Sequence, residues 1–258
     1  MSVRLTAREL TLAYGERTVS TRLTVDVPDG AFTAIIGPNA CGKSTLLRAF
    51  VRLLAPASGE VAFDGRDVRR HHPKAYARTV GFLPQGLVAP EGIVARRLVG
   101  RGRYPHRSAL APWTAADEAA VTAAMSAAGV ADLADRPVDE LSGGQRQRVW
   151  VAMVLAQETP YVLLDEPTTF LDLTHQYELL ALLARLRDEG RTVVAVLHDV
   201  NQACRYADHL IAMRADRVVA EGAPADIVDA ALIQEVFDLP SLVIPDPVTG
   251  TPLVVPSL

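Results

Sequence analysis

Cysteine is scarce in this sequence, and long apolar runs and a surplus of positive charge are absent. Two cysteines among 258 residues cannot form a disulfide framework, and they indicate a reducing compartment. No apolar run approaches the roughly 18 residues that span a bilayer, and the first residues lack the apolar core of a secretory signal. The formal net charge of -4 gives no general attraction to nucleic acid. We therefore expect a soluble, cytosolic protein that does not bind nucleic acid.

The composition is that of a folded chain. Hydrophobic residues make up 49% of it and charged residues 22%, which excludes a disordered or fibrous protein. We find no internal repeat, low-complexity tract or obvious linker. A length of 258 residues is near the upper limit for one hydrophobic core, so we expect a single domain with a sub-lobe.

A phosphate-binding loop is the first motif. Residues 31–36 (AFTAII) predict a buried strand, and an apolar-periodic stretch from Leu46 predicts a helix. Nine residues lie between them, and the first eight match the pattern G-x4-G-K-[ST], which arises by chance roughly once in a thousand chains of this composition. The backbone amides of such a loop bind phosphates; Lys43 adds a charge, and Ser44 offers a hydroxyl to Mg²⁺. The predicted loop consists of Gly37, Pro38, Asn39, Ala40, Cys41, Gly42, Lys43, Ser44 and Thr45.

Two further buried strands end in polar residues. Residues 161–164 (YVLL) precede Asp165 and Glu166, and residues 192–197 (TVVAVL) precede His198. Each pattern alone also fits an ordinary strand end. In a parallel sheet, however, ligands bind where the strands end. We therefore expect Asp165 to hold Mg²⁺, Glu166 to activate a water, and His198 to point into the same crevice.

The sequence LSGGQ at residues 141–145 predicts a second phosphate-binding helix start. Ser142 is a good N-cap, and Gly143 and Gly144 let the backbone approach an anion. The helix is expected over residues 146–157. An ordinary capped helix is the alternative for this motif taken alone.

On these motifs the chain resembles the ATP-binding subunit of ABC transporters over nearly its whole length. The resemblance implies an α/β P-loop NTPase fold with a mostly parallel core sheet, an antiparallel β edge layer and an inserted helical subdomain. Residues 1–258 would form one ABC ATPase domain. Residues 1–85 and 158–258 would be the catalytic core, and residues 86–157 the helical subdomain that carries the LSGGQ signature.

The resemblance also implies cofactors and roles. ATP and Mg²⁺ are the expected cofactors, and Ser44, Gln85 and Asp165 the metal-site residues. Lys43, Gln85, Glu166 and His198 would be catalytic. Nucleotide contacts are further expected from Tyr14, which would stack on adenine, from Asp172 of the D-loop, and from Ser142, Gly143, Gly144 and Gln145. In such proteins two copies dimerise head to tail, so that each signature meets the loop nucleotide of the other copy.

Closer similarity points to ATPases of ferric-siderophore importers. It rests on GRYPH at residues 102–106 and on the tail IPDPVTGTPLVVP at residues 244–256. Such a subunit works at the cytoplasmic face of the membrane with permease subunits and, indirectly, an extracytoplasmic substrate-binding protein. ATPases of haem and cobalamin importers are near relatives and remain alternatives. A soluble ABC ATPase acting on DNA or ribosomes is disfavoured, because there is one P-loop and no sustained heptad pattern. A module without turnover is opposed by Glu166 and His198.

Three local features lead to further expectations. Ala40 stands where these relatives usually have glycine, so a positive φ at this residue would cost about 1 kcal/mol. Ala215 and Asp216 replace a glycine turn, and we expect Asp216 to tolerate the left-handed conformation. The third is a basic stretch without an acid, which is either a solvated face or part of the permease groove. It comprises Arg96, Arg97, Arg101, Arg103 and Arg107.

Overall fold

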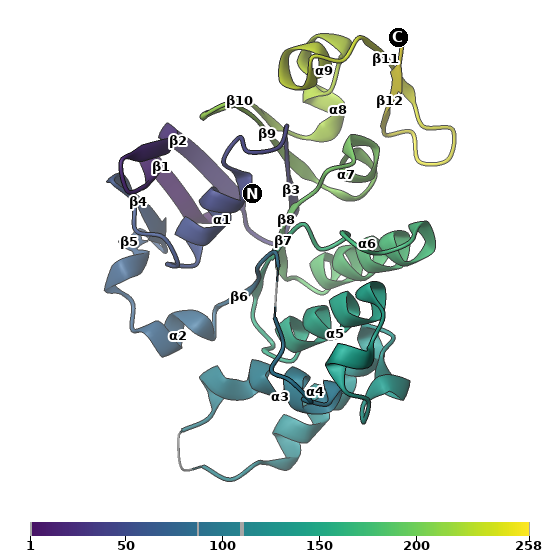
Figure 1. Ribbon diagram of the computed structural model, residues 1–258. Helices are drawn as coiled ribbons and strands as arrows, with labels where there is room; N and C mark the ends of the chain where they lie inside the picture. Colours follow the sequence, from purple (N-terminus) through teal and green to yellow (C-terminus); the bar gives the residue numbers. More distant parts are fainter. Residues whose placement is uncertain (1, 87, 109–110, 258) are drawn as a thin grey trace.

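The computed structural model describes residues 2–86, 88–108 and 111–257, and its centre is a six-stranded sheet (Figure 1). Helices cover one face of this sheet, and antiparallel strands of the N-terminal part with the helix after the glycine-rich loop cover the other, so its central strands are continuous apolar runs rather than alternating ones. The strand order is β10-β9-β3-β8-β7-β6, and only β10 runs antiparallel to its neighbour. The strands are β3 (Phe32–Ile36), β6 (Val80–Leu83), β7 (Tyr161–Asp165), β8 (Thr192–Val196), β9 (His209–Arg214) and β10 (Arg217–Gly222).

A four-stranded antiparallel sheet forms the edge layer, as expected, in the order β2-β1-β4-β5. Its strands are β1 (Val3–Tyr14), β2 (Arg17–Pro28), β4 (Ser58–Phe63) and β5 (Arg66–Asp67). The first two strands are long, with 12 residues each. Irregular register near Glu9 and Arg22, both with positive φ, interrupts the alternation and makes long strands resemble short ones.

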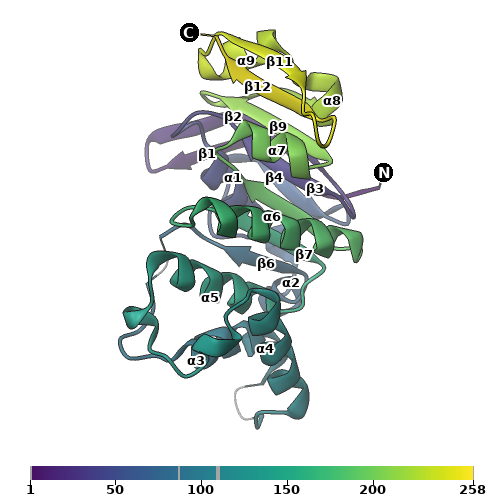
Figure 2. The same cartoon turned by 90° about the vertical axis from the view of Figure 1, so that its right-hand side faces the viewer.

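The inserted helices lie together below the sheet (Figures 1 and 2). The signature helix begins earlier than the expected residue 146, because Ser142 and Gln145 close a capping box at its start. Thr114 caps the helix at residues 115–127 in the same way, with Asp117 as its partner. The elements are α3 (Ala95–Gly100), η2 (Arg101–His106), α4 (Ala115–Ala127), η3 (Ala131–Leu133), η4 (Val138–Glu140) and α5 (Gly143–Leu155).

The basic stretch at residues 96–107 is not a uniformly solvated face, and this corrects the first of the two alternatives expected for it. Arg103 is only 6% exposed and lies against acidic residues from other parts of the chain. Arg96 pairs with Glu118. Arg107 lies over the ring of Trp113 at 5.1 Å. Folding therefore supplies the acids that the stretch itself lacks.

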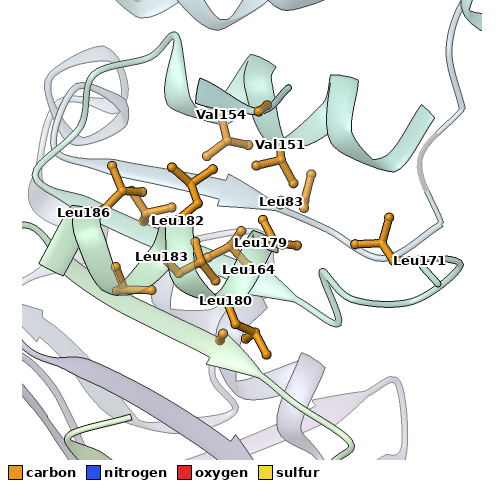
Figure 3. Close-up of a cluster of buried hydrophobic side chains, with 14 of the residues drawn as sticks. Leu83, Val151, Val154, Leu164, Leu171, Leu179, Leu180, Leu182, Leu183 and Leu186 are labelled. Carbon is orange, nitrogen blue, oxygen red and sulfur yellow. The ribbon is translucent and has the colours of Figure 1, made fainter. Parts of the chain in front are cut away.

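A leucine-rich core joins the inserted helices to the sheet (Figure 3). Its side chains come from β6, β7, α5 and α6, and Leu164, Leu180 and Leu183 are fully buried. The leucines of α6 recur at positions three and four apart, which places them on one face of the helix. Two helices flank this sheet, α6 (Leu173–Asp188) and α7 (Val200–Tyr206).

The remaining elements lie at the periphery. Around the edge layer are α1 (Lys43–Phe50), η1 (Val68–Arg70) and α2 (Pro73–Ala77), and the C-terminal part holds α8 (Pro224–Ile227), α9 (Ala230–Phe237), β11 (Ser241–Pro245) and β12 (Pro252–Pro256). Figure 2 shows the C-terminal hairpin at the end of the molecule opposite the inserted helices. In the part of the chain that the structure describes, no helix combines the length and the apolar character that a bilayer crossing requires.

Candidate functional site

The glycine-rich loop connects β3 to α1 and has the backbone that its glycines require. Gly37 and Gly42 have φ values of 149° and 102°. A Cβ atom on Gly37 would lie 2.1 Å from the carbonyl oxygen of Met213, and one on Gly42 would lie 2.6 Å from Ser20 Oγ. Side chains at either position are therefore excluded by both conformation and space.

Two alanines occupy left-handed positions. Ala40 has φ 63°, so the strain expected for alanine at this position is present. Ala215 has φ 53°. The expectation that Asp216 would take this conformation was wrong, because the turn places the left-handed residue one position earlier.

Lys43 is the buried cation of the loop. Lys43 is only 5% exposed. Its Nζ donates hydrogen bonds to the carbonyl oxygens of Gly37 and Pro38 at 2.9 and 2.8 Å. Cys41 Sγ lies 3.9 Å from the same Nζ, and burial raises the pKa of the Cys41 thiol. The thiol is thus a small buried group of the loop, with little tendency to ionise.

Asp165 ends β7 and contacts the first turn of α1. Ser44 Oγ donates a hydrogen bond to Asp165 Oδ1 at 2.7 Å. Asp165 is only 1% exposed. Its other carboxylate oxygen, Oδ2, has no hydrogen-bond partner among the described residues. Burial raises the pKa of the Asp165 carboxyl, while the bond from Ser44 acts in the opposite direction.

Glu166, Gln85 and His198 meet beside this pair. Gln85 Nε2 donates to Glu166 Oε2 at 2.6 Å, and His198 Nε2 lies 2.8 Å from the same oxygen. Gln85 follows β6, Glu166 follows β7, and His198 follows β8. The carboxyl ends of three parallel strands therefore bring together side chains that are far apart in sequence.

A cavity of about 520 Å³ adjoins these groups. Tyr14 borders it and is 44% exposed, and its hydroxyl accepts a hydrogen bond from Arg48 at 3.1 Å. The sequence analysis missed Arg17 and Val19. Both lie at the start of β2, two positions apart, and residues two apart in a strand point to the same face, which could have indicated them. The cavity is lined by Tyr14, Arg17, Val19, Asn39, Ala40, Gly42, Lys43, Ser44, Thr45, Gln85, Glu166 and His198.

The signature and Asp172 do not line this cavity. Ser142 and Gln145 serve the capping box of α5, and Asp172 caps α6 by accepting from the backbone of His175 at 3.0 Å. A Cβ atom on Gly143 would lie 3.5 Å from Phe170 Cβ, which places the signature next to the segment before Asp172. Within one chain, these residues form a separate surface.

Known proteins are similar to this chain over most of its length. A family model described as ABC transporter matches residues 20–169. The ferric enterobactin transport ATP-binding protein FepC of Escherichia coli is 57% identical over 254 residues, which cover 98% of this chain and 94% of FepC. The achromobactin transport ATP-binding protein CbrD of Dickeya dadantii is 52% identical over 253 residues, at 98% and 94% coverage.

Solved structures share the fold. A metal-chelate-type ABC transporter in an inward-facing conformation matches with a TM-score of 0.85 and 28% identity, covering 100% of this chain and 98% of that one. A bacterial ABC transporter cassette solved as a dimer matches with a TM-score of 0.77 and 28% identity, covering 85% and 98%. The family match over more than half of the chain and the identities of 57% and 52% show that this protein belongs to the ABC transporter family, as an ATP-binding subunit that hydrolyses ATP.

Proposed function

We propose that this chain energises an importer of ferric siderophores. The observation that carries the ATPase function is the convergence of Lys43, the Ser44–Asp165 pair and Glu166 at one cavity. The substrate class rests on relatives named for ferric enterobactin and achromobactin transport, at 57% and 52% identity. A cobalamin import protein of Halobacterium salinarum is 41% identical, and the match covers 58% of it. The iron-chelate substrate is therefore favoured over cobalamin.

The loop and Tyr14 would hold the nucleotide. In this proposal the amides of residues 37–45 bind phosphate oxygens, and Lys43 turns from the loop carbonyls to the β- and γ-phosphates. Tyr14 presents its exposed ring at the edge of the cavity, where an adenine can stack on it. Arg17 and Val19 extend the same face.

The Ser44–Asp165 pair fits Mg²⁺. Both groups offer oxygen, the donor that Mg²⁺ prefers, and Asp165 Oδ2 is a buried carboxylate oxygen without a partner among the described residues. A buried anionic oxygen beside the phosphate loop is stabilised by a nearby cation. Ser44, Asp165 and Gln85 would hold the ion, which when bound neutralises charge on the phosphates.

Glu166 would take the proton of the attacking water. Both contacts from Gln85 and His198 reach Oε2, which leaves Oε1 to accept from a water. Gln85 and His198 thereby hold the carboxylate in one orientation, and this reduces the cost of positioning it for reaction. His198, half exposed at the cavity, would also contact the γ-phosphate of a bound nucleotide.

The separate surface of the signature suits a second copy. We propose a head-to-tail homodimer in which Ser142, Gly143, Gly144 and Gln145 of one copy, with Asp172, complete the nucleotide site of the other. Residues 86–157 would act as the helical subdomain and the rest of residues 1–258 as the catalytic core. Two such subunits would bind the membrane permease at its cytoplasmic face, and an extracytoplasmic protein would deliver the chelate.

Growth of a deletion strain tests the substrate class. We expect loss of growth on a ferric siderophore as the sole iron source, with cobalamin uptake retained. Plasmid-borne wild-type chain should restore growth, and the Glu166→Gln variant should not. Loss of cobalamin uptake with normal siderophore use would contradict the proposal.

A further inference from the structure

The short helix η2 is pressed against the end of the signature helix α5. A Cβ atom on Gly102 would lie 2.1 Å from the carbonyl oxygen of Met153, so only glycine permits this approach. His106 Nε2 lies 2.7 Å from the carbonyl oxygen of Gln157. The GRYPH segment therefore packs along the last turn of α5 and the residues that come directly after this helix.

Arg103 ties this segment to two others from a buried position. Its Nε donates to Asp117 Oδ1 of α4 at 3.1 Å, and its Nη1 donates to Glu158 Oε2 at 2.6 Å and to the carbonyl oxygen of Ala156 at 2.8 Å. The other oxygen of Asp117 accepts from Thr114, the N-cap of α4, at 2.8 Å. Arg103 therefore joins the start of α4 to the end of α5.

The same segment also contacts the core. Arg78 of the segment after α2 donates from Nε to the carbonyl oxygen of Pro105 at 2.7 Å, and Lys74 of α2 donates to the carbonyl oxygen of Arg107. Helix η2 is consequently a bridge between the inserted helices and the core, with Arg103 at its centre.

The outer side of this bridge borders a second cavity, of about 950 Å³. Arg101 and Tyr104 line it, and Tyr104 is 61% exposed. Arg103, between these two residues in sequence, points inward and lines neither this cavity nor the nucleotide cavity. The elements that Arg103 contacts lead to the nucleotide machinery. Helix α5 begins at the signature, and the chain after Glu158 continues into β7, which ends at Asp165.

We propose that Arg103 is a positioning residue that couples the cavity beside η2 to the signature helix. When the membrane subunit occupies that cavity, Arg103 transmits the displacement of η2 to α5. The forked guanidinium suits this role because it holds three acceptors in fixed directions, which a lysine ammonium on a flexible chain does not do. The inference rests on the proposed function, since it requires a permease.

The decisive measurement compares basal and permease-stimulated ATPase activity of the full chain, alone and with its permease in lipid vesicles. Arg103→Lys and Glu158→Gln are the test variants. Glu158 is more than half exposed, so its substitution leaves the fold intact even if Arg103→Lys lowers stability. Arg217→Lys is the matched control, because Arg217 forms an exposed pair with Glu235 outside this cavity.

We expect stimulated turnover to fall about 2- to 30-fold in both test variants, with basal turnover and permease pull-down unchanged. Arg103→Lys combined with Glu158→Gln should lose less than the two single losses added together, because both variants act on one contact. Full stimulation in folded Glu158→Gln and Arg103→Lys would overturn the proposal. A proportional fall of basal turnover would also overturn it, because that is the signature of a merely structural role. Absence of stimulation or pull-down for the unaltered chain would instead reject the proposed function.

Discussion

Ser44 Oγ donates to Asp165 Oδ1 at 2.7 Å, although 121 positions separate the two residues in the chain. Ser44 lies in the first turn of α1, and Asp165 is the last residue of β7, two strands from β3 in the sheet. This contact joins the phosphate loop to the acidic strand end, and it leaves Asp165 Oδ2 buried without a partner among the described residues. The arrangement is unfavourable for the free subunit and suited to a cation.

Asp165→Asn should raise thermal stability of the nucleotide-free protein and abolish Mg²⁺-dependent turnover. Burial raises the folded-state pKa of Asp165 above its unfolded-state value of about 3.9, so the carboxylate begins to lower stability as pH rises above that value and does so fully above the folded-state pKa. The advantage of the variant should therefore be present at pH 7, shrink as pH falls through the folded-state pKa, and vanish below about 3.9. Thermal unfolding against pH measures this. A variant that melts below wild type at pH 7 would contradict the prediction.

Lys43→Ala should weaken ATP binding about 10- to 100-fold, as expected for loss of a charged hydrogen-bonding group. Lys43 is buried in the loop and would be the ammonium that reaches the phosphates. Titration of the purified subunit with a fluorescent ATP analogue measures the affinity. Lys74→Ala, in α2, is the control and should bind normally. Wild-type affinity in the Lys43 variant would reject the loop assignment.

Glu166→Gln should keep ATP binding and reduce hydrolysis by about 10²- to 10⁴-fold, because the amide keeps the shape of the side chain but cannot take a proton. With ATP and Mg²⁺ present, the variant should elute as a dimer in size-exclusion chromatography. Glu189→Gln, an exposed change at the end of α6, should hydrolyse ATP normally. If Glu166→Gln turns over ATP at the wild-type rate, Glu166 is not the base.

Ala40→Gly should stabilise the subunit by about 1 kcal/mol, which corresponds to a rise of roughly 2–4 °C in melting temperature. Ala40 has φ 63°, a conformation that glycine adopts without strain. Calorimetry of the nucleotide-free chain provides the measurement. Ala49→Gly, inside helix α1, is the matched control and should lower the melting temperature. A decrease for Ala40→Gly would show that the loop carries no such strain.

Arg97→Glu and Arg101→Glu should weaken assembly with the permease and leave the ATP affinity of the free subunit unchanged. Both residues line the cavity beside η2, and charge reversal at the rim of an interface penalises association. Pull-down of the permease, repeated at raised salt, measures the effect. Arg217→Glu on β10 serves as the control. Undiminished recovery of the permease would show that these arginines only form a solvated face.

Local motifs made much of the site predictable. The loop at residues 37–45, the N-cap Ser142 and the acids after residues 161–164 each lie within one short segment. Parallel strands also end at one edge of a sheet, so the meeting of Glu166 and His198 followed from topology. These features depend on neighbours in sequence or on strand direction, and both are visible in the residues themselves.

Other features required the tertiary structure. The sequence by itself determined the P-loop, the helix caps and the family, because these depend on short segments with fixed backbone preferences. The burial of Arg103 and the separation of the signature from the nucleotide cavity were decided by contacts between distant segments. Arg103 illustrates the reason. Its charge is part of a basic run in the sequence, but its partners Asp117, Ala156 and Glu158 come from other elements, and only packing of those elements removes its side chain from water.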